Sequence, residues 1–190
     1  MDNEQLPKGY KNTEVGVIPE DWEVKELGNC LLRNPDYGLN AAAVTFDDTL
    51  PTYLRITDIS DDGRFISAGK ASVKNIYSNN YYLEKGDIVF ARTGASVGKT
   101  YLYNENDGKL VFAGFLIRIK PNPEIVDCNY LIYLTQTKKY WAWVSANSMR
   151  SGQPGLNSNE YKSFQISLPP TKSEQTAIAT ALSDADALIN

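Results

Sequence analysis

The segment FQISLPPTKSEQTAIATALSDADALIN runs from Phe164 to Asn190 and contains a short apolar strand, a proline pair and an amphipathic helix. Thr171 and Glu174 have the spacing of a capping box, in which two side chains satisfy free amides at a helix start. Pro169 and Pro170 disfavour an earlier helical start. The segment therefore predicts a strand that leads directly into a long helix.

The predicted helix carries one apolar seam. Its members follow one another with steps of four, three and four residues: Ile178, Leu182, Ala185 and Ile189. Two helices that pack along each other require this spacing. No preceding segment offers a matching heptad pattern, so we expect the covering helix in a partner chain or elsewhere in the parent protein. Docking of the helix on its own domain is an equal alternative, and the pattern does not decide between them.

Composition limits the class of protein. A chain of 190 residues with 42% apolar residues is long enough for one domain with a core and a small appendage. No apolar run reaches the roughly 18 residues of a membrane span, and the polar, acidic N-terminus does not resemble a signal peptide. We therefore expect a cytoplasmic protein. Cys30 and Cys128 are interpreted as small buried residues, not as a disulfide or metal site.

The chain contains no histidine. This excludes Ser-His-Asp and Cys-His catalysis, histidine metal sites and imidazole acid-base chemistry. No pair of carboxylates is marked as a catalytic couple among 23 acidic residues. The sequence therefore predicts a protein without catalytic residues, bound metal or cofactor.

Charge is unevenly distributed along the chain. Residues 1–62 carry a net charge of −8, residues 63–172 carry +7 and the remaining tail carries −3. A basic middle is compatible with a nucleic-acid face, where Lys and Arg neutralise phosphates. The overall pI of 4.9 argues against a free-standing nonspecific binder. Acids and bases that mix on the folded surface are the alternative.

The predicted fold class is α+β, a mixed and mainly antiparallel β-rich domain with one prominent helix, followed by the amphipathic helix of coiled-coil type. We expect the domain at residues 1–168, with an irregular leader at 1–21, and the helix at 169–190. Predicted strands cover 52–59, 86–93, 99–103, 110–120 and 164–168. Asp127 can cap the prominent helix, whose buried stripe comprises Tyr130, Leu134, Thr137, Trp141 and Val144. Trp141 and Trp143 are expected to pack in the core or an interface.

Two segments resemble catalytic motifs without meeting their requirements. GASVGKT, Gly94 to Thr100, has three residues between its glycines where a phosphate-binding P-loop has four. It also leads into a strand pattern instead of a helix, so we expect a strand, a turn and a strand. NPDY, Asn34 to Tyr37, is similar to the Asn-Pro-Pro-Tyr loop of amino-methyltransferases. No glycine-rich cofactor turn precedes it, and a turn is the better interpretation.

Five stretches together resemble the DNA-specificity subunit of type I restriction-modification systems, as one target recognition domain plus the start of its spacer helix. In the order of that family they are YKNTEVGVIPEDWEVKELG (Tyr10 to Gly28), YLRITDIS (Tyr53 to Ser60), GDIVFARTGASVGKT (Gly86 to Thr100), SGQPGLN (Ser151 to Asn157) and ISLPPTKSEQTAIATAL (Ile166 to Leu182). They extend over nearly the whole chain, and their order makes the resemblance specific.

The resemblance implies a function and a set of partners. Such subunits usually carry two recognition domains, each reading half of a split site in double-stranded DNA, separated by antiparallel helices. They perform no chemistry themselves. Methyltransferase (M) subunits that bind them modify adenine, and a restriction and translocase (R) subunit cleaves DNA. The helix at 169–190 would be the first spacer helix, and it would pair with a second recognition domain or with a second copy of the chain.

Two segments concentrate side chains suited to DNA contact, one after the prominent helix and one after Phe90. Arg can recognise guanine, and Asn or Gln can recognise adenine. The candidate DNA-binding residues are Lys70, Lys74, Arg92, Thr93, Ser96, Lys99, Arg150, Ser151, Gln153 and Asn157. In the family the two segments recur among subunits with different targets, which favours backbone contact. Discrimination between bases is then expected in residues 37–52, 64–82 and 104–109. A protein-interaction or regulatory half-subunit without DNA reading is the alternative function.

Overall fold

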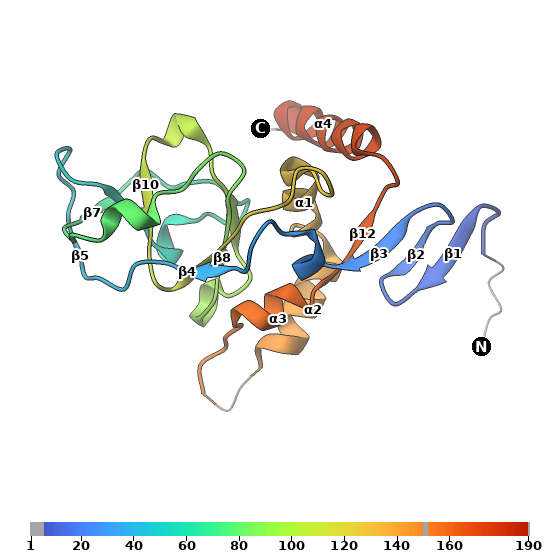
Figure 1. Cartoon of the computed structure of the whole chain (residues 1–190), viewed down its shortest axis with the longest axis horizontal. Coiled ribbons are helices and arrows are strands. Elements are labelled where there is room, and N and C mark those ends of the chain that lie inside the picture. The colour runs from blue at the N-terminus through green and yellow to red at the C-terminus, as the bar shows by residue number, and fades with distance from the viewer. Residues whose placement is uncertain (1–5, 150–151, 190) are drawn as a thin grey trace.

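The computed structural model of the chain describes residues 6–149 and 152–189 and confirms the α+β class (Figure 1). The strands are β1 (Tyr10–Thr13), β2 (Gly16–Pro19), β3 (Glu23–Glu26), β4 (Asp36–Tyr37), β5 (Ala43–Thr45), β6 (Thr52–Leu54), β7 (Ala71–Val73), β8 (Ile88–Ala91), β9 (Thr100–Leu102), β10 (Leu110–Phe112), β11 (Leu116–Ile119) and β12 (Gln165–Leu168). The α-helices are α1 (Cys128–Leu134), α2 (Lys138–Ser148), α3 (Ser158–Lys162) and α4 (Lys172–Ile189). Short 3-10 helices form at Leu27–Cys30, Ile56–Asp58, Ser78–Tyr81, Gly94–Ser96 and Glu105–Asp107.

Two four-stranded sheets form the body of the molecule. One has the strand order β10-β6-β7-β5 and the other has the order β4-β11-β8-β9. The pairing of β10 with β6 is parallel, whereas the other strand pairs of the two sheets are antiparallel. Figure 1 shows β5 and β7 at one end of the long axis and the antiparallel β1–β2 hairpin at the other. The sheets thus agree with the predicted mainly antiparallel arrangement.

Strand β8 joins the hydrophobic clusters of the core because it is buried on both faces. Ile88 and Phe90 pack into a cluster shared with α1, α2 and α3. Val89 and Ala91 point to the opposite face and pack with residues of β6, β9 and β10. Alternate side chains of a strand face opposite sides of its sheet, so a continuous apolar run is typical of such a doubly covered strand.

The segment that resembled a P-loop is a strand, a turn and a strand, as predicted. Strands β8 and β9 pair antiparallel, and Lys99 leads directly into β9. Gly98 within the turn has φ +89°, and an added Cβ would lie 2.7 Å from Val144 Cγ1. Glycine at this position therefore permits both the backbone turn and the close approach of α2.

The N-terminal segment is more regular than the sequence indicated. Residues 10–19, predicted as part of an irregular leader, form the β1–β2 hairpin. Thr13 Oγ1 donates a hydrogen bond to the Gly16 carbonyl at 2.7 Å, and Gly16 adopts φ +96°. Val15 and Ile18 are buried, so the hairpin contributes to the hydrophobic interior. Thr and Gly at the turn were visible signals, but the strands lack a clear apolar alternation.

The prominent helix predicted after Asp127 is two helices. Asp127 caps α1 as expected, with its side chain accepting hydrogen bonds from the amides of Asn129 and Tyr130. The helix ends after Leu134, and Thr137 caps α2 by accepting from the Tyr140 amide at 3.2 Å. The predicted stripe is therefore divided between two axes, which leaves Trp141 exposed although Trp143 packs against the core.

Two other predicted strands are shorter than expected. The segment 52–59 is β6 followed by the 3-10 helix Ile56–Asp58. The segment 110–120 is β10 and β11, separated by a turn that contains Gly114 and Phe115. The backbone at Gly38 passes this turn so closely that a Cβ there would lie 2.2 Å from the Ala113 carbonyl oxygen. The turn thus brings β4 beside the end of β10.

Helix α4 begins at the predicted place and docks on α1 through its first half. Thr171 Oγ1 accepts from the Glu174 amide, while the Glu174 carboxylate accepts from the Trp22 indole at 3.1 Å. Gln175 and Ala179 are buried against the domain. From Ala181 onward the described residues of the helix are exposed. Among residues 6–149 and 152–189, no helix has the length and apolar character needed to cross a membrane.

Candidate nucleic-acid interface

The structure brings the two segments with candidate DNA-binding residues together. The loop before α3 lies along the turn after β8, where the Gly94 amide donates to the Pro154 carbonyl at 3.0 Å and the Leu156 amide donates to the Arg92 carbonyl at 2.9 Å. An added Cβ at Gly94, which has φ +68°, would lie 3.0 Å from Gln153 Nε2. The two segments are about 60 residues apart in sequence, so their contact is a property of the fold.

Four of the ten candidates line one small cleft in this region. Its volume is about 310 Å³, and its walls include Arg92, Thr93, Gln153 and Asn157. Thr93 Oγ1 lies 3.5 Å from the Pro154 carbonyl oxygen. Asn157 has a structural task as well, because its side-chain oxygen accepts from two amides at the start of α3. We call this hollow the Gln153 cleft.

Arg92 has an unusual environment for an arginine. Its guanidinium carbon lies 4.9 Å from the centre of the Tyr37 ring, a favourable placement of a cation over an aromatic face. Its Nε is buried and makes no hydrogen bond within the described residues. None of the ion pairs found in the described ranges includes Arg92. Within the described domain, no carboxylate therefore lies within ion-pair distance of Arg92, although the charge of Glu160 acts on the neighbouring Tyr37.

Arg92 also lines a second, larger cleft of about 750 Å³, which we call the Phe115 cleft. Its walls are mainly apolar or aromatic and come from the segment 37–43, the start of the 3-10 helix Ile56–Asp58 and the turn between β10 and β11. The lining residues are Tyr37, Gly38, Leu39, Asn40, Ala41, Ala43, Tyr53, Arg55, Ile56, Thr57, Arg92, Ala113, Gly114 and Phe115. Neither this cleft nor the Gln153 cleft is lined by Asp or Glu from the described part of the chain.

Tyr37 is held in place by contacts of its hydroxyl group and of the preceding residue. Its hydroxyl accepts from the Ser158 amide at 3.2 Å. Burial alone would raise the pKa of Tyr37, but hydrogen bonds with Ser158 and the nearby charge of Arg92 outweigh burial and lower it. The preceding residue, Asp36, accepts two hydrogen bonds from Arg118, at 2.6 and 3.0 Å. The platform under Arg92 is thus attached, through the half-buried Asp36, to the buried Arg118.

Arg118 itself stands at the centre of a buried network. Its guanidinium lies 4.7 Å from the Phe112 ring centre and 3.5 Å from Asp87. Burial raises the pKa of Asp87, although the Glu84 amide and the charge of Arg118 act in the opposite direction. Such a network orients these strands relative to one another, because β4 and β11 contribute Asp36 and Arg118 and Asp87 directly precedes β8.

The remaining candidates lie elsewhere or have other partners. Ser96 belongs to the same turn as Arg92 but lines neither cleft. Lys99 Nζ lies 2.8 Å from the Asp61 carboxylate. Lys70 lies over the Phe46 ring at 3.9 Å, and Lys74 is exposed after β7. Arg150 and Ser151 lie outside the described residues.

Two residues of the clefts were missing from the sequence-based candidates, Tyr37 and Phe115. Tyr37 lies in the segment NPDY, which was interpreted only as a turn, although it opens one of the regions expected to discriminate bases. Phe115 was placed inside a continuous strand. The preceding Gly114 was a signal for a turn at that position, because glycine inside a strand pattern often marks an interruption.

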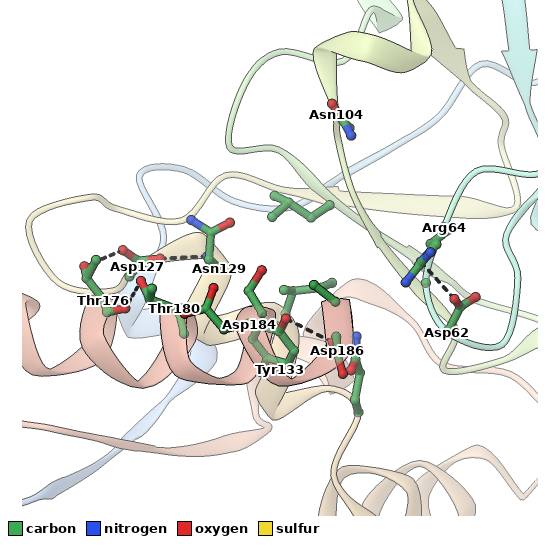
Figure 2. A pocket seen from close by; sticks show the side chains of 17 residues that line it. Asp62, Arg64, Asn104, Asp127, Asn129, Tyr133, Thr176, Thr180, Asp184 and Asp186 are labelled. Carbon is green, nitrogen blue, oxygen red and sulfur yellow. Dashed lines mark hydrogen bonds and ion pairs between the residues drawn. The ribbon is translucent and has the colours of Figure 1, made fainter. Parts of the chain in front are cut away.

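A third hollow, of about 780 Å³, has the opposite electrostatic character (Figure 2). It lies between α1, α4 and the turn at Asp62–Arg64, and four of its lining residues are Asp62, Asp127, Asp184 and Asp186. Asp127 accepts from Thr176 Oγ1 at 2.8 Å, and Asp186 accepts from the Tyr133 hydroxyl at 3.1 Å. Figure 1 shows α4 and α3 on opposite sides of β12. The acidic hollow beside α4 is thus separated from the Gln153 cleft beside α3.

Comparison with known proteins identifies the family. Residues 19–190 match the family described as Type I restriction modification DNA specificity domain. The chain is 32% identical over 96% of its length to the "Putative type I restriction enzyme MjaX specificity subunit" of Methanocaldococcus jannaschii, and 26% identical to the MjaVIII specificity subunit of the same organism. It spans only 43% and 40% of those two proteins.

Solved structures share the fold. The HsdS subunit from Thermoanaerobacter tengcongensis superposes with a TM-score of 0.68 at 18% identity, over 90% of this chain and 44% of that one. A chain from a study of complex assembly and conformational transition of the type I R-M system gives a TM-score of 0.64, over 88% of this chain and 43% of that one. The fold similarity thus extends over most of this chain and less than half of each solved one.

Proposed function

The chain belongs to the type I restriction-modification DNA specificity domain family, and we propose that it recognises a specific sequence of double-stranded DNA. In this proposal it acts as a specificity subunit or half-subunit that directs adenine methyltransferase and restriction subunits to a bipartite site. It supplies recognition, while the bound subunits supply the chemistry.

One observation supports the proposed position of the DNA interface. In a chain with pI 4.9, the Gln153 cleft and the Phe115 cleft share Arg92, and carboxylates of the described residues line neither. DNA phosphates are attracted by an arginine without an internal anion and repelled by Asp and Glu. The acidic hollow beside α4 is therefore unsuited to DNA, whereas the two clefts around Arg92 are suited to it.

The residues of these clefts have different expected roles. Arg92 is proposed to bind a phosphate, because no carboxylate of the described residues lies within ion-pair distance of it. Gln153, in the other of the two segments with candidate residues, is likewise expected to contact the sugar-phosphate backbone. Base discrimination is assigned to the segment 37–43, which forms one wall of the Phe115 cleft. Phosphate contacts position the protein, and contacts with base edges select the sequence.

The partners follow from the same family relationship. Methyltransferase subunits and the restriction and translocase subunit are expected to bind the complete specificity subunit. The exposed second half of α4, which includes Leu182, is available for a second recognition domain or a second copy. A regulatory half-subunit that docks through α4 without DNA reading is the alternative, and its support is the exposure of the same helix.

A binding titration tests the proposed function. The chain, assembled with its methyltransferase subunits, is titrated with duplexes that contain or lack the methylated motif found by methylome sequencing of the host. We expect preference for one motif and a logarithm of the binding constant that falls linearly with the logarithm of salt concentration. Equal binding of all duplexes, or a methylome unchanged by deletion of the gene, would contradict DNA recognition and favour the docking alternative.

A further inference from the structure

We propose that the Phe115 cleft binds the methyl-bearing edge of a thymine in the target site. This inference rests on the proposed function and adds the chemical group that the cleft reads. It concerns the major-groove face of the duplex, where base pairs differ in the groups that they display.

The first support is the apolar character of the cleft. Phe115 is 60% exposed, and it stands at the turn between β10 and β11 beside Leu39 and Tyr37. An exposed cluster of apolar and aromatic side chains on a nucleic-acid face is matched by an apolar partner. In the major groove that partner is the C5-methyl group of thymine, since the other distinguishing groups are hydrogen-bond donors and acceptors.

The second support is the fixed relation between the cleft and a cation. The Arg92 amide donates to the Phe115 carbonyl at 3.0 Å, so the two side chains leave adjacent, hydrogen-bonded backbone segments. Arg92 lines the cleft and has no carboxylate partner among the residues that the structure describes. A phosphate held by Arg92 would therefore place the groove edge of a nearby base at Phe115.

The third support is the rigidity of the cleft walls. An added Cβ at Gly38 would overlap the Ala113 carbonyl, and one at Gly114 would lie 3.4 Å from Asn40 Cα. The Tyr53 hydroxyl donates to the Ala41 carbonyl at 3.2 Å, which fastens the same wall to β6. A preformed apolar surface loses little conformational entropy on binding, so it can discriminate a single methyl group.

Uracil substitution tests this assignment. Each thymine of the target motif is replaced in turn by uracil, which removes only the methyl group, and affinity is measured for the chain assembled with its methyltransferase subunits. We expect about fourfold weaker binding at one or two positions, the ratio expected for one buried methyl group. In Phe115→Ala these positions should lose their sensitivity to uracil, whereas Phe115→Leu should retain part of it. Tyr10→Ala is the control, because Tyr10 is an exposed aromatic residue of β1 and lies outside both clefts and outside the segments expected to discriminate bases.

The outcomes separate this inference from the proposed function. Sequence-specific binding without any uracil-sensitive position, or with sensitivity unchanged in Phe115→Ala, would overturn the thymine assignment and leave DNA recognition intact. Absence of any sequence preference in the wild-type complex would overturn both the thymine assignment and the proposed DNA recognition. Fluorescence of 2-aminopurine would detect an unstacked base at Phe115, away from the methylated adenine. Such a base would occupy the cleft itself and would overturn the proposed contact with a thymine edge.

Discussion

At the scale of single residues, Arg92 combines a positive charge, an aromatic support and a buried Nε without a hydrogen-bond partner in the described domain. A buried polar group that makes no hydrogen bond costs about 1–3 kcal/mol. Such a group is satisfied by a bound water, a ligand or a partner. The environment of Arg92 is therefore more informative than its charge alone, which it shares with many surface residues.

Replacement of Arg92 by alanine should weaken DNA binding roughly ten- to a hundredfold, the range for hydrogen bonds with a charged group. If Arg92 binds a phosphate, the loss should be similar for all sequences and the salt slope should fall by about one. Arg92→Lys should recover only part of the affinity, because an ammonium cannot reproduce the planar stacking on Tyr37. Fluorescence anisotropy at several salt concentrations measures both quantities.

Lys25→Ala is the control for this experiment. Lys25 of β3 is paired with the exposed Glu23 at 3.0 Å and lies outside both clefts and outside the segments expected to discriminate bases. Its removal should change affinity less than twofold. An equal loss in both variants would show that general charge, and not the position of Arg92, determines binding.

Replacement of Arg118 should mainly lower the free energy of unfolding. It should affect DNA binding only indirectly, through the position of Tyr37. Arg118→Ala leaves Asp87 and Asp36 without their buried partner, and loss of one member of a buried ion pair costs about 3–5 kcal/mol. Lys25→Ala removes a cation of β3 whose partner Glu23 is largely exposed and which lies outside this network, and it should cost less than about 1 kcal/mol. Urea denaturation measures both changes. Similar losses in the two variants would contradict a special role for the buried pair.

At the scale of elements, Asp127 connects two helices. It caps α1 and accepts from Thr176 of α4. Burial alone would raise the pKa of Asp127, but the hydrogen bonds from Thr176 and from the amides of Asn129 and Tyr130 outweigh it and hold the pKa below its usual value. The ionised carboxylate therefore stabilises the folded protein above the unfolded pKa of about 4. This stabilisation is lost as pH falls through the folded pKa.

Asp127→Asn should expose this dependence on pH. Asparagine is also a good helix cap, so the variant keeps the cap and loses the charge. The difference in unfolding free energy between wild type and variant should be largest near pH 7 and should shrink as pH falls from 5 towards 3. Urea denaturation across this range measures it. A difference that stays constant with pH would contradict the role of the ionised carboxylate.

Two variants of α4 separate this role from a general effect on the helix. Thr176→Ala removes the hydroxyl that donates to Asp127 and should reproduce part of the loss near pH 7. Ser173→Ala removes an exposed hydroxyl of the same helix and should have little effect on stability.

The elements that the sequence predicted well are those with local signals. The start of α1 at Asp127, the strand β12 and the proline-preceded start of α4 all follow from nearby residues. The division of the helix after Leu134 depends instead on distant contacts. Thr135 Oγ1 lies 2.7 Å from Thr100 Oγ1 of β9, and the Tyr140 hydroxyl donates to the Gly98 carbonyl at 2.7 Å. Helical periodicity contains no information about such partners.

The candidate site shows the same distinction. Arg92 and Gln153 were predicted because their residue types suit DNA contact. Tyr37 and Phe115 join them only because β11 pairs with both β4 and β8. That sheet order is set by tertiary pairing and is not visible in any one segment. The DNA contacts of all these residues remain predictions, and the variants of Arg92 and Phe115 test two of them.

At the scale of the whole molecule, helix α4 divides into two parts with different surroundings. Ile178 packs against the domain core, and the neighbouring Ala179 is buried. Leu182, Leu188 and Ile189 are exposed, the last two by more than 80%. The first half of α4 therefore docks on its own domain, which was one of the two alternatives for the apolar seam. The second half leaves its part of the seam uncovered, as the other alternative, a partner helix, requires. The second half of α4 also forms a wall of the acidic hollow through Asp184 and Asp186. No residue of α4 lines either cleft around Arg92, so one molecule can offer DNA and protein partners separate surfaces.

The uncovered part of the seam should mediate association between two copies of the chain. We expect the double variant Leu182→Glu and Ile189→Glu to dimerise at least a hundredfold more weakly than wild type, since each buried apolar side chain contributes about 1.5–3 kcal/mol. The double variant Ala177→Glu and Ala181→Glu, which adds the same two charges at exposed positions of α4 outside the seam, should dimerise nearly as well as wild type. Sedimentation equilibrium measures association, and circular dichroism verifies that the variants remain folded. Dimers of equal strength in wild type and double variant, or a wild type that stays monomeric at high concentration, would show that the seam serves another partner.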